Sequence, residues 1–245
     1  MNKRYFVGDI HGCSHLLEEL LNRIWVSEQD EWVFLGDYID RGPDIKGVLD
    51  RLIKLSEQTN TVFLRGNHEQ MLLDFIDNDD RLFLQNDSQL ATINSVLGQK
   101  LLYYPYTQSI FDERMMDVTY SVRKLFPKDY LEFIRDTIYY QEFDEQLVVH
   151  GGVDFKRLLE DNPLDLMWNR NFKSGFPLDK VQIIGHTPNE TVQITDDRKT
   201  VNIDTGAFFT NQLTVIEFDI AERVYINRSK GYDGQALDLY VPEIK

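Results

Sequence analysis

The sequence predicts an α/β fold in which parallel strands alternate with helices. Two observations predict it. Five apolar runs of strand length each end in a short polar stretch, and the first two of these stretches are followed by segments with helical periodicity. Strands that are joined through a helix lie parallel in one sheet, so this order is typical of βαβ units.

The elements can be assigned in chain order. The strand-like runs are residues 5–7, 32–35, 61–64, 147–149 and 181–184. The apolar face of the helix predicted after the first run consists of Leu16, Leu17, Leu20, Leu21 and Ile24. The apolar face of the helix after the second run consists of Ile45, Val48, Leu49, Leu52 and Ile53. Ser14 is the expected N-cap of the first helix, and Pro43 is expected to open the second. Three later runs, at 200–204, 213–220 and 223–227, predict further strands.

The segment from about residue 70 to 146 differs from the rest, because helical periodicity and acidic residues dominate there. We interpret it as a helical insertion beside the alternating units. The chain has 245 residues and is 42% hydrophobic, which suffices for one substantial core. We therefore expect residues 1–245 to form a single domain that carries this insertion.

Composition limits the partners and the compartment. The chain has 26 basic and 41 acidic residues, a net charge of −15, and no cluster of Lys or Arg that could follow a phosphate backbone, so nucleic acid is not an expected partner. The single cysteine, Cys13, excludes an intrachain disulfide, and no apolar run has the length of a membrane span or signal-peptide core. We expect a cytoplasmic protein without membrane contact. The sequence does not set its oligomeric state.

The polar stretches that follow the strands hold residue types that bind divalent metals. They read GDIHG (8–12), GDYIDRG (36–42), LRGNHE (64–69), HGG (150–152) and GHT (185–187), and they contain four of the five histidines. The carboxyl ends of strands in an α/β sheet collect ligands, and Asp, Asn and His suit hard or borderline cations. Taken singly, Asp37 and Asp40 could be helix caps, and His150 and His186 could be core residues. Because all five stretches follow a strand, a metal site is the better interpretation.

In this order and spacing, the stretches resemble the motifs of the metal-dependent serine/threonine phosphoprotein phosphatases, a family of the calcineurin-like metallophosphoesterase superfamily. The motifs span residues 8–187, about three quarters of the chain, and the short length is similar to bacterial and phage members. The resemblance implies a four-layer α/β sandwich of two mixed β-sheets flanked by helices. Regulatory subunits of the eukaryotic kind are not implied, because residues 203–206 run almost directly into the next strand without the tyrosine-bearing loop of eukaryotic members.

The resemblance also implies a dinuclear metal site. Its ligands would be Asp9, His11 and Asp37 for one divalent ion and Asp37, Asn67, His150 and His186 for the other, with Asp37 shared. Mn²⁺ is the ion we expect to work in vitro, and Fe or Zn are alternatives. A hydroxide bound by both ions would attack phosphorus in line.

Further residues receive roles from the same resemblance. His68 would be the general acid, oriented by Asp40. Arg41 would bind the substrate phosphate, and Arg170 occupies the place of a second phosphate-binding arginine. Asp204, at the end of a later strand, could either support a ligand histidine or form a turn before Gly206.

The implied activity is hydrolysis of phosphomonoesters, above all phosphoserine and phosphothreonine in proteins, with dual specificity and small phosphomonoesters also open. Diadenosine tetraphosphate hydrolases are the first alternative, because they share the GDxHG and GNH motifs and the metal chemistry. Asp40 favours a phosphatase, since those relatives commonly replace this aspartate. A non-catalytic scaffold is the second alternative, and the intact ligand set, His68 and Arg41 argue against it.

Overall fold

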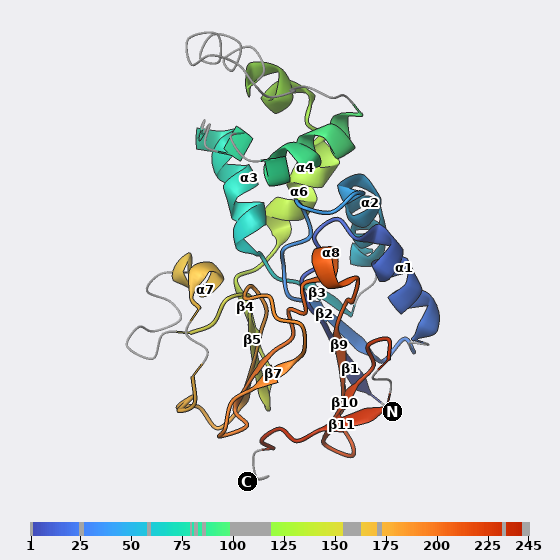
Figure 1. The fold of residues 1–245 in the computed structure, drawn as a ribbon, viewed down its shortest axis with the longest axis vertical. Coiled ribbons are helices and arrows are strands. Elements are labelled where there is room, and N and C mark those ends of the chain that lie inside the picture. Colours follow the sequence, from blue (N-terminus) through green and yellow to red (C-terminus); the bar gives the residue numbers. More distant parts are fainter. Residues whose placement is uncertain are drawn as a thin grey trace.

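The computed structural model describes residues 2–24, 27–57, 60–78, 80, 83–84, 87–98, 119–153, 163–170, 173–231 and 234–241. Two β-sheets pack face to face, with helices along the outer side of one sheet and above the upper edge of both (Figure 1). The predicted α/β fold of two mixed sheets flanked by helices is therefore confirmed.

The strands, in chain order, are β1 Lys3–Val7, β2 Glu31–Phe34, β3 Thr61–Phe63, β4 Tyr140–Glu142, β5 Gln146–Val149, β6 Val181–Ile184, β7 Gln193–Ile194, β8 Thr200–Asn202, β9 Val215–Asp219, β10 Val224–Asn227 and β11 Gln235–Leu237. Within the described ranges, the first sheet has the order β11-β10-β9-β1-β2-β3 and the second has the order β4-β5-β6-β8-β7. The strands β1, β2 and β3 are parallel, and so are β5, β6 and β8. The strands β9, β4 and β7 pair antiparallel to their neighbours, which makes both sheets mixed.

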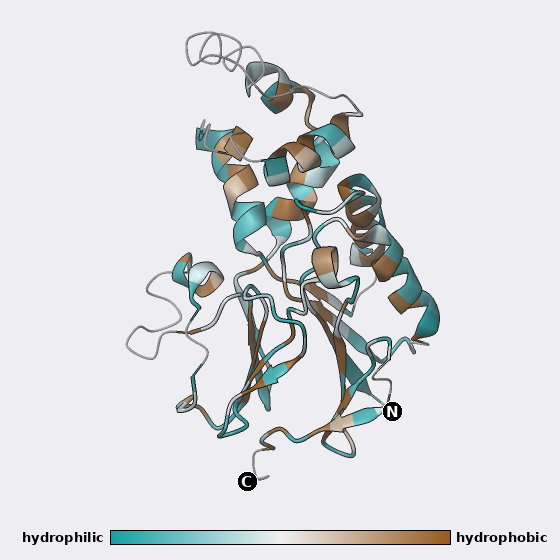
Figure 2. Cartoon of the chain, in the orientation of Figure 1, coloured by the Kyte–Doolittle hydropathy of each residue, from teal (hydrophilic) through white to brown (hydrophobic). Residues whose placement is uncertain are grey.

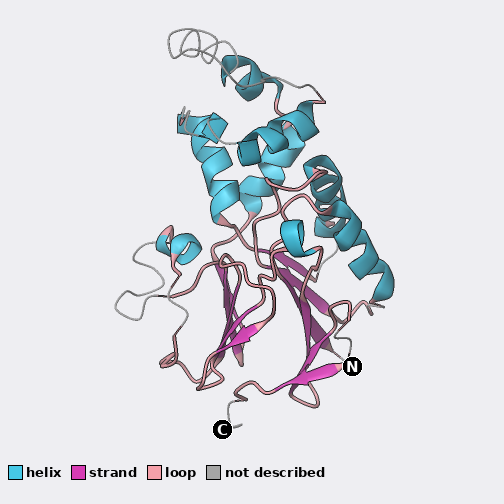
Figure 3. Cartoon of the chain, in the orientation of Figure 1, coloured by secondary structure: helices cyan, strands magenta, loops and turns pink. Residues whose placement is uncertain are grey.

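The helices are α1 Ser14–Arg23, α2 Ile45–Ser56, α3 Asn67–Asn78, α4 Asp87–Leu97, α6 Lys128–Asp136, α7 Asp165–Trp168 and α8 Ala207–Thr210. Helices α1 and α2 lie along the outer side of the first sheet, and α3, α4 and α6 stand above the sheets (Figure 1). Figure 3 shows loops joining the upper strand ends to these helices. None of the helices in the described part of the chain combines the length and the apolar character that a membrane span requires.

Alternate side chains of the central strands enter different cores. In β1, Tyr5 and Val7 pack with residues of α1 and α2, whereas Phe6 packs between the two sheets. In β5, Val148 also faces the space between the sheets, while its neighbours pack with Leu166 of α7 on the opposite side. Because these strands are buried on both faces, they read as continuous apolar runs, and Figure 2 shows them brown over most of their length.

The starts of α1 and α2 differ from the prediction. The N-cap of α1 is Cys13, and Ser14 is the first helical residue, whose hydroxyl donates to Oδ2 of Asp44 at 2.5 Å. Asp44 is the N-cap of α2 and accepts from the backbone N–H of Gly47, so the helix begins after Pro43. The predictions for Ser14 and Pro43 are therefore wrong. The Ser14 hydroxyl binds Asp44 instead of capping α1, and the Asp44 carboxylate caps α2, so that α2 begins at Ile45.

Three short strands, β4, β7 and β11, carry no apolar run and were not expected from the sequence. They pair at or near the sheet edges, where side chains need not be apolar on both faces. The predicted insertion is helical in α3, α4, residues 119–125 and α6, and then enters β4 of the second sheet. Its residues 79, 81–82, 85–86 and 99–118 lie outside the described residues. The single-domain organisation stays a prediction.

Candidate metal centre

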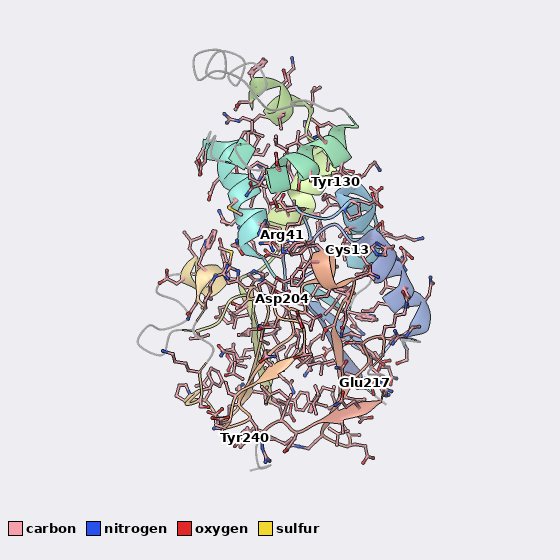
Figure 4. All side chains as sticks on the ribbon, in the orientation of Figure 1. Cys13, Arg41, Tyr130, Asp204, Glu217 and Tyr240 are labelled. Carbon is pink, nitrogen blue, oxygen red and sulfur yellow. The ribbon has the colours of Figure 1, made fainter. Side chains whose placement is uncertain are left out.

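The predicted metal ligands come together where loops of the two sheets meet. The loops after β1 and β2 and the start of α3 approach from one side, and the loops after β5 and β6 approach from the other. The six side chains are at most 4% exposed: Asp9, His11, Asp37, Asn67, His150 and His186. Figure 4 shows this junction between the labelled Arg41 and Asp204.

Asp37 lies at the centre of this cluster. Its Oδ2 is 3.4 Å from Nε2 of His11, and its Oδ1 is 3.3 Å from Nε2 of His150. Ligand atoms of Asp37, His150 and His186 all lie within 4.8 Å of one another, and the same holds for His11, Asp37 and His68. One carboxylate thus faces two groups of nitrogen atoms, an arrangement in which it could bridge two cations.

Hydrogen bonds set which nitrogen of each histidine points into the cluster. Nδ1 of His11 is 2.8 Å from the carbonyl oxygen of Ile39, and Nδ1 of His150 is 2.8 Å from that of Leu35. A carbonyl oxygen only accepts, so Nδ1 carries the donated proton in both rings. Nε2 then faces Asp37 and is available to a metal, as in metal sites whose histidines donate their other N–H to a carbonyl.

Asn67, His186 and Asp9 complete the second group. Oδ1 of Asn67 is 2.8 Å from Nδ1 of His186 and 3.2 Å from Nε2 of His150. The carboxylate oxygens of Asp9 accept from the backbone N–H of His186 at 3.3 and 3.1 Å. Nε2 of His186 is buried without a hydrogen-bond partner among the described residues. Leaving such an atom unpaired costs about 1–3 kcal/mol, so a ligand is expected beside it.

The electrostatics favour positive charge in the cluster. Burial lowers the pKa of His150, but Asp37 and Asp9 outweigh this effect and raise that pKa to about 10. Burial raises the pKa of Asp37, but His150 and His68 bring it well below its usual range. Burial and the charge of His150 together lower the pKa of His186 to about 3. Positive charge is therefore stabilised at His150, next to Asp37 and Asp9, and a divalent cation bound there would supply it.

The donor set fits two divalent cations. Carboxylate oxygens, an amide oxygen and imidazole nitrogens are accepted by Mn²⁺, Fe²⁺ and Zn²⁺, so the ligand chemistry does not choose among them. One ion could be held by Asp9, His11 and Asp37, and the other by Asp37, Asn67, His150 and His186.

His68 lies beside the cluster, with each ring nitrogen near a charged group. Its Nδ1 is 2.6 Å from Oδ2 of Asp40, and its Nε2 is 3.3 Å from Nη2 of Arg41 and 3.8 Å from Oδ2 of Asp37. Burial lowers the pKa of His68, but the charges of Asp37 and Asp40 outweigh burial and leave that pKa raised. A raised pKa keeps the ring protonated at higher pH, which suits a proton donor.

Glu69 joins the loop after β2 to the loop after β3. Its Oε2 accepts from the backbone N–H of Asp37 at 2.8 Å and of Gly66 at 3.0 Å. Its Oε1 accepts from the backbone N–H of Tyr38 at 2.8 Å and of Ile39 at 3.3 Å. The side chain is completely buried. One carboxylate therefore fixes two metal-binding loops relative to each other.

Strained backbone is concentrated in the site. Of the eight described non-glycine residues with positive φ, five belong to it: His11, Asp37, Asp40, Arg41 and His186. Such conformations cost about 1–3 kcal/mol each and persist where the surroundings hold them. Close approach also requires glycine at two positions. A Cβ at Gly66 would lie 2.1 Å from Oδ1 of Asp37, and one at Gly185 would lie 2.2 Å from Oδ1 of Asp9.

Aromatic side chains border the cluster on its exposed side. Phe208 of α8 is 40% exposed, and its ring centroid is 5.7 Å from that of His11 and 4.7 Å from Cζ of Arg41. Trp168 of α7 is 49% exposed, and its ring is 6.0 Å from that of His186. Both rings are partly exposed and each lies next to a histidine of the cluster.

Arg170 and Asp204 are both within electrostatic range of cluster residues. Arg170 is exposed, and its charge adds to the effects of burial and His150 in lowering the pKa of His186, which places it within electrostatic range of that ring. Asp204 is buried, and its Oδ1 accepts from the backbone N–H of Gly206 at 2.9 Å. This hydrogen bond agrees with the turn-forming alternative for Asp204.

The sequence profile of the calcineurin-like phosphoesterases matches residues 3–216, the part of the chain that carries all of these loops. The chain belongs to the calcineurin-like phosphoesterase family. It is therefore a hydrolase of the metallophosphoesterase type, and the superfamily implied by the motifs is confirmed.

Relatives of this phosphoesterase fall into different branches. The asymmetrical bis(5′-nucleosyl)-tetraphosphatase PrpE of Anoxybacillus flavithermus is 25% identical over 246 residues, covering 92% of this chain and 94% of that protein. Serine/threonine-protein phosphatase 1 of Salmonella typhimurium is 49% identical over 71 residues, covering 29% of this chain and 31% of that protein. The cold-active protein-tyrosine phosphatase of a Shewanella species has a TM-score of 0.64 at 18% identity, covering 96% of this chain and 79% of that one, and shares the fold.

Sequence reasoning missed three residues that contact the site of this phosphoesterase. Phe208 and Trp168 lie in the short helices α8 and α7, and Thr92 lies in α4, where its hydroxyl contacts Asp40. None of them belongs to a polar stretch at a strand end, which was the signal that found the others.

Proposed function

We propose that this phosphoesterase hydrolyses phosphomonoesters that have alkyl leaving groups, and that phosphorylated serine and threonine side chains are its substrate class. The observation that carries the proposal is the contact of 2.6 Å between Nδ1 of His68 and Oδ2 of Asp40, beside the metal cluster. An alkoxide is a poor leaving group and needs a proton as its bond to phosphorus breaks. A positioned histidine can supply that proton.

In this proposal, each residue of the chain has a defined task. Arg41 binds oxygens of the substrate phosphate, with its guanidinium near the Phe208 ring, and Arg170 assists from near His186. Two divalent cations, when bound, would neutralise charge on the phosphate and lower the pKa of the attacking water. The attacking water would react as hydroxide, after releasing one proton to solvent. As its oxygen bonds to phosphorus, the bond to the leaving oxygen would break, and Nε2 of His68 would donate its proton to this oxygen. Asp40 accepts from Nδ1 and stabilises the protonated ring before the transfer.

Hydrolysis of dinucleoside tetraphosphates is a second candidate. The similarity to the tetraphosphatase from Anoxybacillus flavithermus covers 92% of this chain and favours it, whereas the similarity to the serine/threonine phosphatase is confined to 71 residues. In such a substrate the leaving oxygen belongs to a phosphate, whose second pKa is about 6, and it departs without protonation. The two candidates therefore differ in how strongly turnover depends on His68.

Initial rates would separate the two candidates. The Mn²⁺-reconstituted protein is given phosphoserine, phosphothreonine and phosphotyrosine peptides and, separately, diadenosine tetraphosphate. We expect phosphoserine and phosphothreonine peptides to be turned over fastest. Asp37→Asn is the control and should lose metal and activity toward every substrate. Faster turnover of diadenosine tetraphosphate would overturn the proposal in favour of the second candidate.

The role of His68 is tested by its substitution. His68→Asn should lower kcat for a phosphoserine peptide about 100-fold, the scale of general acid catalysis. The loss should be much smaller for para-nitrophenyl phosphate, whose phenoxide leaves without a proton. Metal content is measured in parallel, because His68 also lies within 4.8 Å of the ligand atoms of His11 and Asp37. Equal losses on both substrates, or loss of a metal ion, would contradict the assignment as general acid.

A further inference from the structure

Helix α4 contacts the loop that carries Asp40 and Arg41. Oγ1 of Thr92 accepts from the backbone N–H of Asp40 at 2.9 Å, and the same hydroxyl donates to Oδ1 of Asp40 in a short hydrogen bond. Both side chains are completely buried. One threonine hydroxyl therefore holds both the main chain and the carboxylate of Asp40.

Two more residues on the same side of α4 contact this loop and the first turn of α2 that follows it. The carbonyl oxygen of Ser88 accepts from the backbone N–H of Arg41 at 3.3 Å, and Oγ of Ser95 accepts from the backbone N–H of Lys46 at 3.0 Å. Ser88, Thr92 and Ser95 are four and three residues apart, so they lie on one helical face. Helix α4 thus holds the loop at Asp40 and Arg41, and it holds the start of α2 at Lys46.

The loop conformation requires such support. The φ angles of Asp40 and Arg41 are 68° and 67°, a region that costs about 1–3 kcal/mol for each non-glycine residue unless neighbouring groups hold it. The two oxygens of Asp40 are divided between its partners, since Oδ2 is bound to His68 and Oδ1 to Thr92. A carboxylate bound through both oxygens cannot rotate, so the direction of the His68 ring depends on Thr92.

We propose that Thr92 is a positioning residue for the proposed general acid: it fixes Asp40, and Asp40 directs Nε2 of His68 toward the leaving oxygen. This inference rests on the proposed role of His68. It also gives the helical insertion a task in catalysis, because α4 supplies the hydroxyl.

The test compares substrates that do and do not need a proton on the leaving group. Thr92→Val keeps the side-chain shape but removes both hydrogen bonds, and Thr92→Ser keeps the hydroxyl. Thr119→Val is the matched control, because Thr119 is also buried in the insertion and its hydroxyl has no hydrogen-bond partner among the described residues. The same preparation of each variant is assayed on a phosphoserine peptide and on para-nitrophenyl phosphate, so that any unfolded fraction affects both rates equally.

We expect Thr92→Val to lower kcat for the phosphoserine peptide about tenfold and kcat for para-nitrophenyl phosphate less than about twofold, as for a group that orients a catalytic side chain. Thr92→Ser should retain at least about half of the wild-type rate on both substrates, and Thr119→Val should leave their ratio unchanged. Suppose that His68→Asn loses activity selectively on the phosphoserine peptide. If Thr92→Val then loses activity equally on both substrates, or loses none, the proposed role of Thr92 is overturned. A His68→Asn variant without selective loss would instead overturn the proposed acid, and the role of Thr92 with it.

Discussion

Replacing Glu69 by Gln is expected to weaken the fold and the metal centre together, although the side chain keeps its size. Each carboxylate oxygen accepts two backbone N–H groups, from Asp37 and Gly66 at Oε2 and from Tyr38 and Ile39 at Oε1. An amide has one oxygen and one NH₂ group. Whichever way the Gln amide is turned, two backbone N–H donors face another donor.

The size of the effect follows from this count. A buried donor that loses its acceptor costs about 1–3 kcal/mol, so two of them lower the free energy of unfolding by about 2–6 kcal/mol. The lower end applies when the NH₂ group faces Tyr38 and Ile39, because the contact to Ile39 is the longest of the four at 3.3 Å. Domains of this kind have about 5–15 kcal/mol in total, so the loss is substantial.

Urea unfolding followed by intrinsic fluorescence measures this loss, and the metal content of the folded protein shows whether the two loops still align. Glu57→Gln makes the same chemical change at an exposed position and should leave both quantities unchanged. A decrease below about 1 kcal/mol for Glu69→Gln would refute the reasoning, because it would mean that the four hydrogen bonds are dispensable.

Three further predictions concern phosphate, metal and pH. Arg41→Lys should raise KM for a phosphoserine peptide and weaken inhibition by inorganic phosphate about tenfold, because an ammonium group cannot bind two oxygens as a guanidinium does; unchanged inhibition would remove Arg41 from the phosphate site. Chelation of divalent ions should lower Tm, and added Mn²⁺ should raise it in a concentration-dependent manner; a Tm that ignores Mn²⁺ would contradict the metal centre. Glu217, labelled in Figure 4, is buried, but Arg228 and Lys3, each 2.6 Å away, outweigh burial and lower its pKa. The stability that the ionised Glu217 contributes is fully present above the unfolded pKa of about 4.3, and it is lost as pH falls through the lower folded pKa. Glu217→Gln should therefore lower the free energy of unfolding by about 2 kcal/mol at neutral pH and by less in acid. A decrease that does not change with pH would contradict this ion pair.

Several features of this protein could be predicted from the sequence because local chemistry and local geometry coincide there. The strands β1, β2, β5 and β6 are buried on both faces, and burial on both faces appears in the sequence as an uninterrupted apolar run. His150 directly follows such a run, and Asp37 follows one after Gly36, so their place at a strand end could be inferred without knowing the sheet order. The sequence by itself therefore determined the α/β class, and the resemblance of its motifs indicated the superfamily and the side chains that meet in the cluster.

The tertiary structure decided which of these groups support one another. Thr92 and Asp40 are 52 residues apart, and Asn67 and His186 are 119 residues apart, yet each pair is joined by hydrogen bonds. A threonine on a buried helical face has the same local pattern whether or not its hydroxyl reaches a carboxylate on another element. The residue pattern of a helix or strand indicates which of its faces is buried. Which residues of other elements contact that face is determined only by the packing of the whole chain.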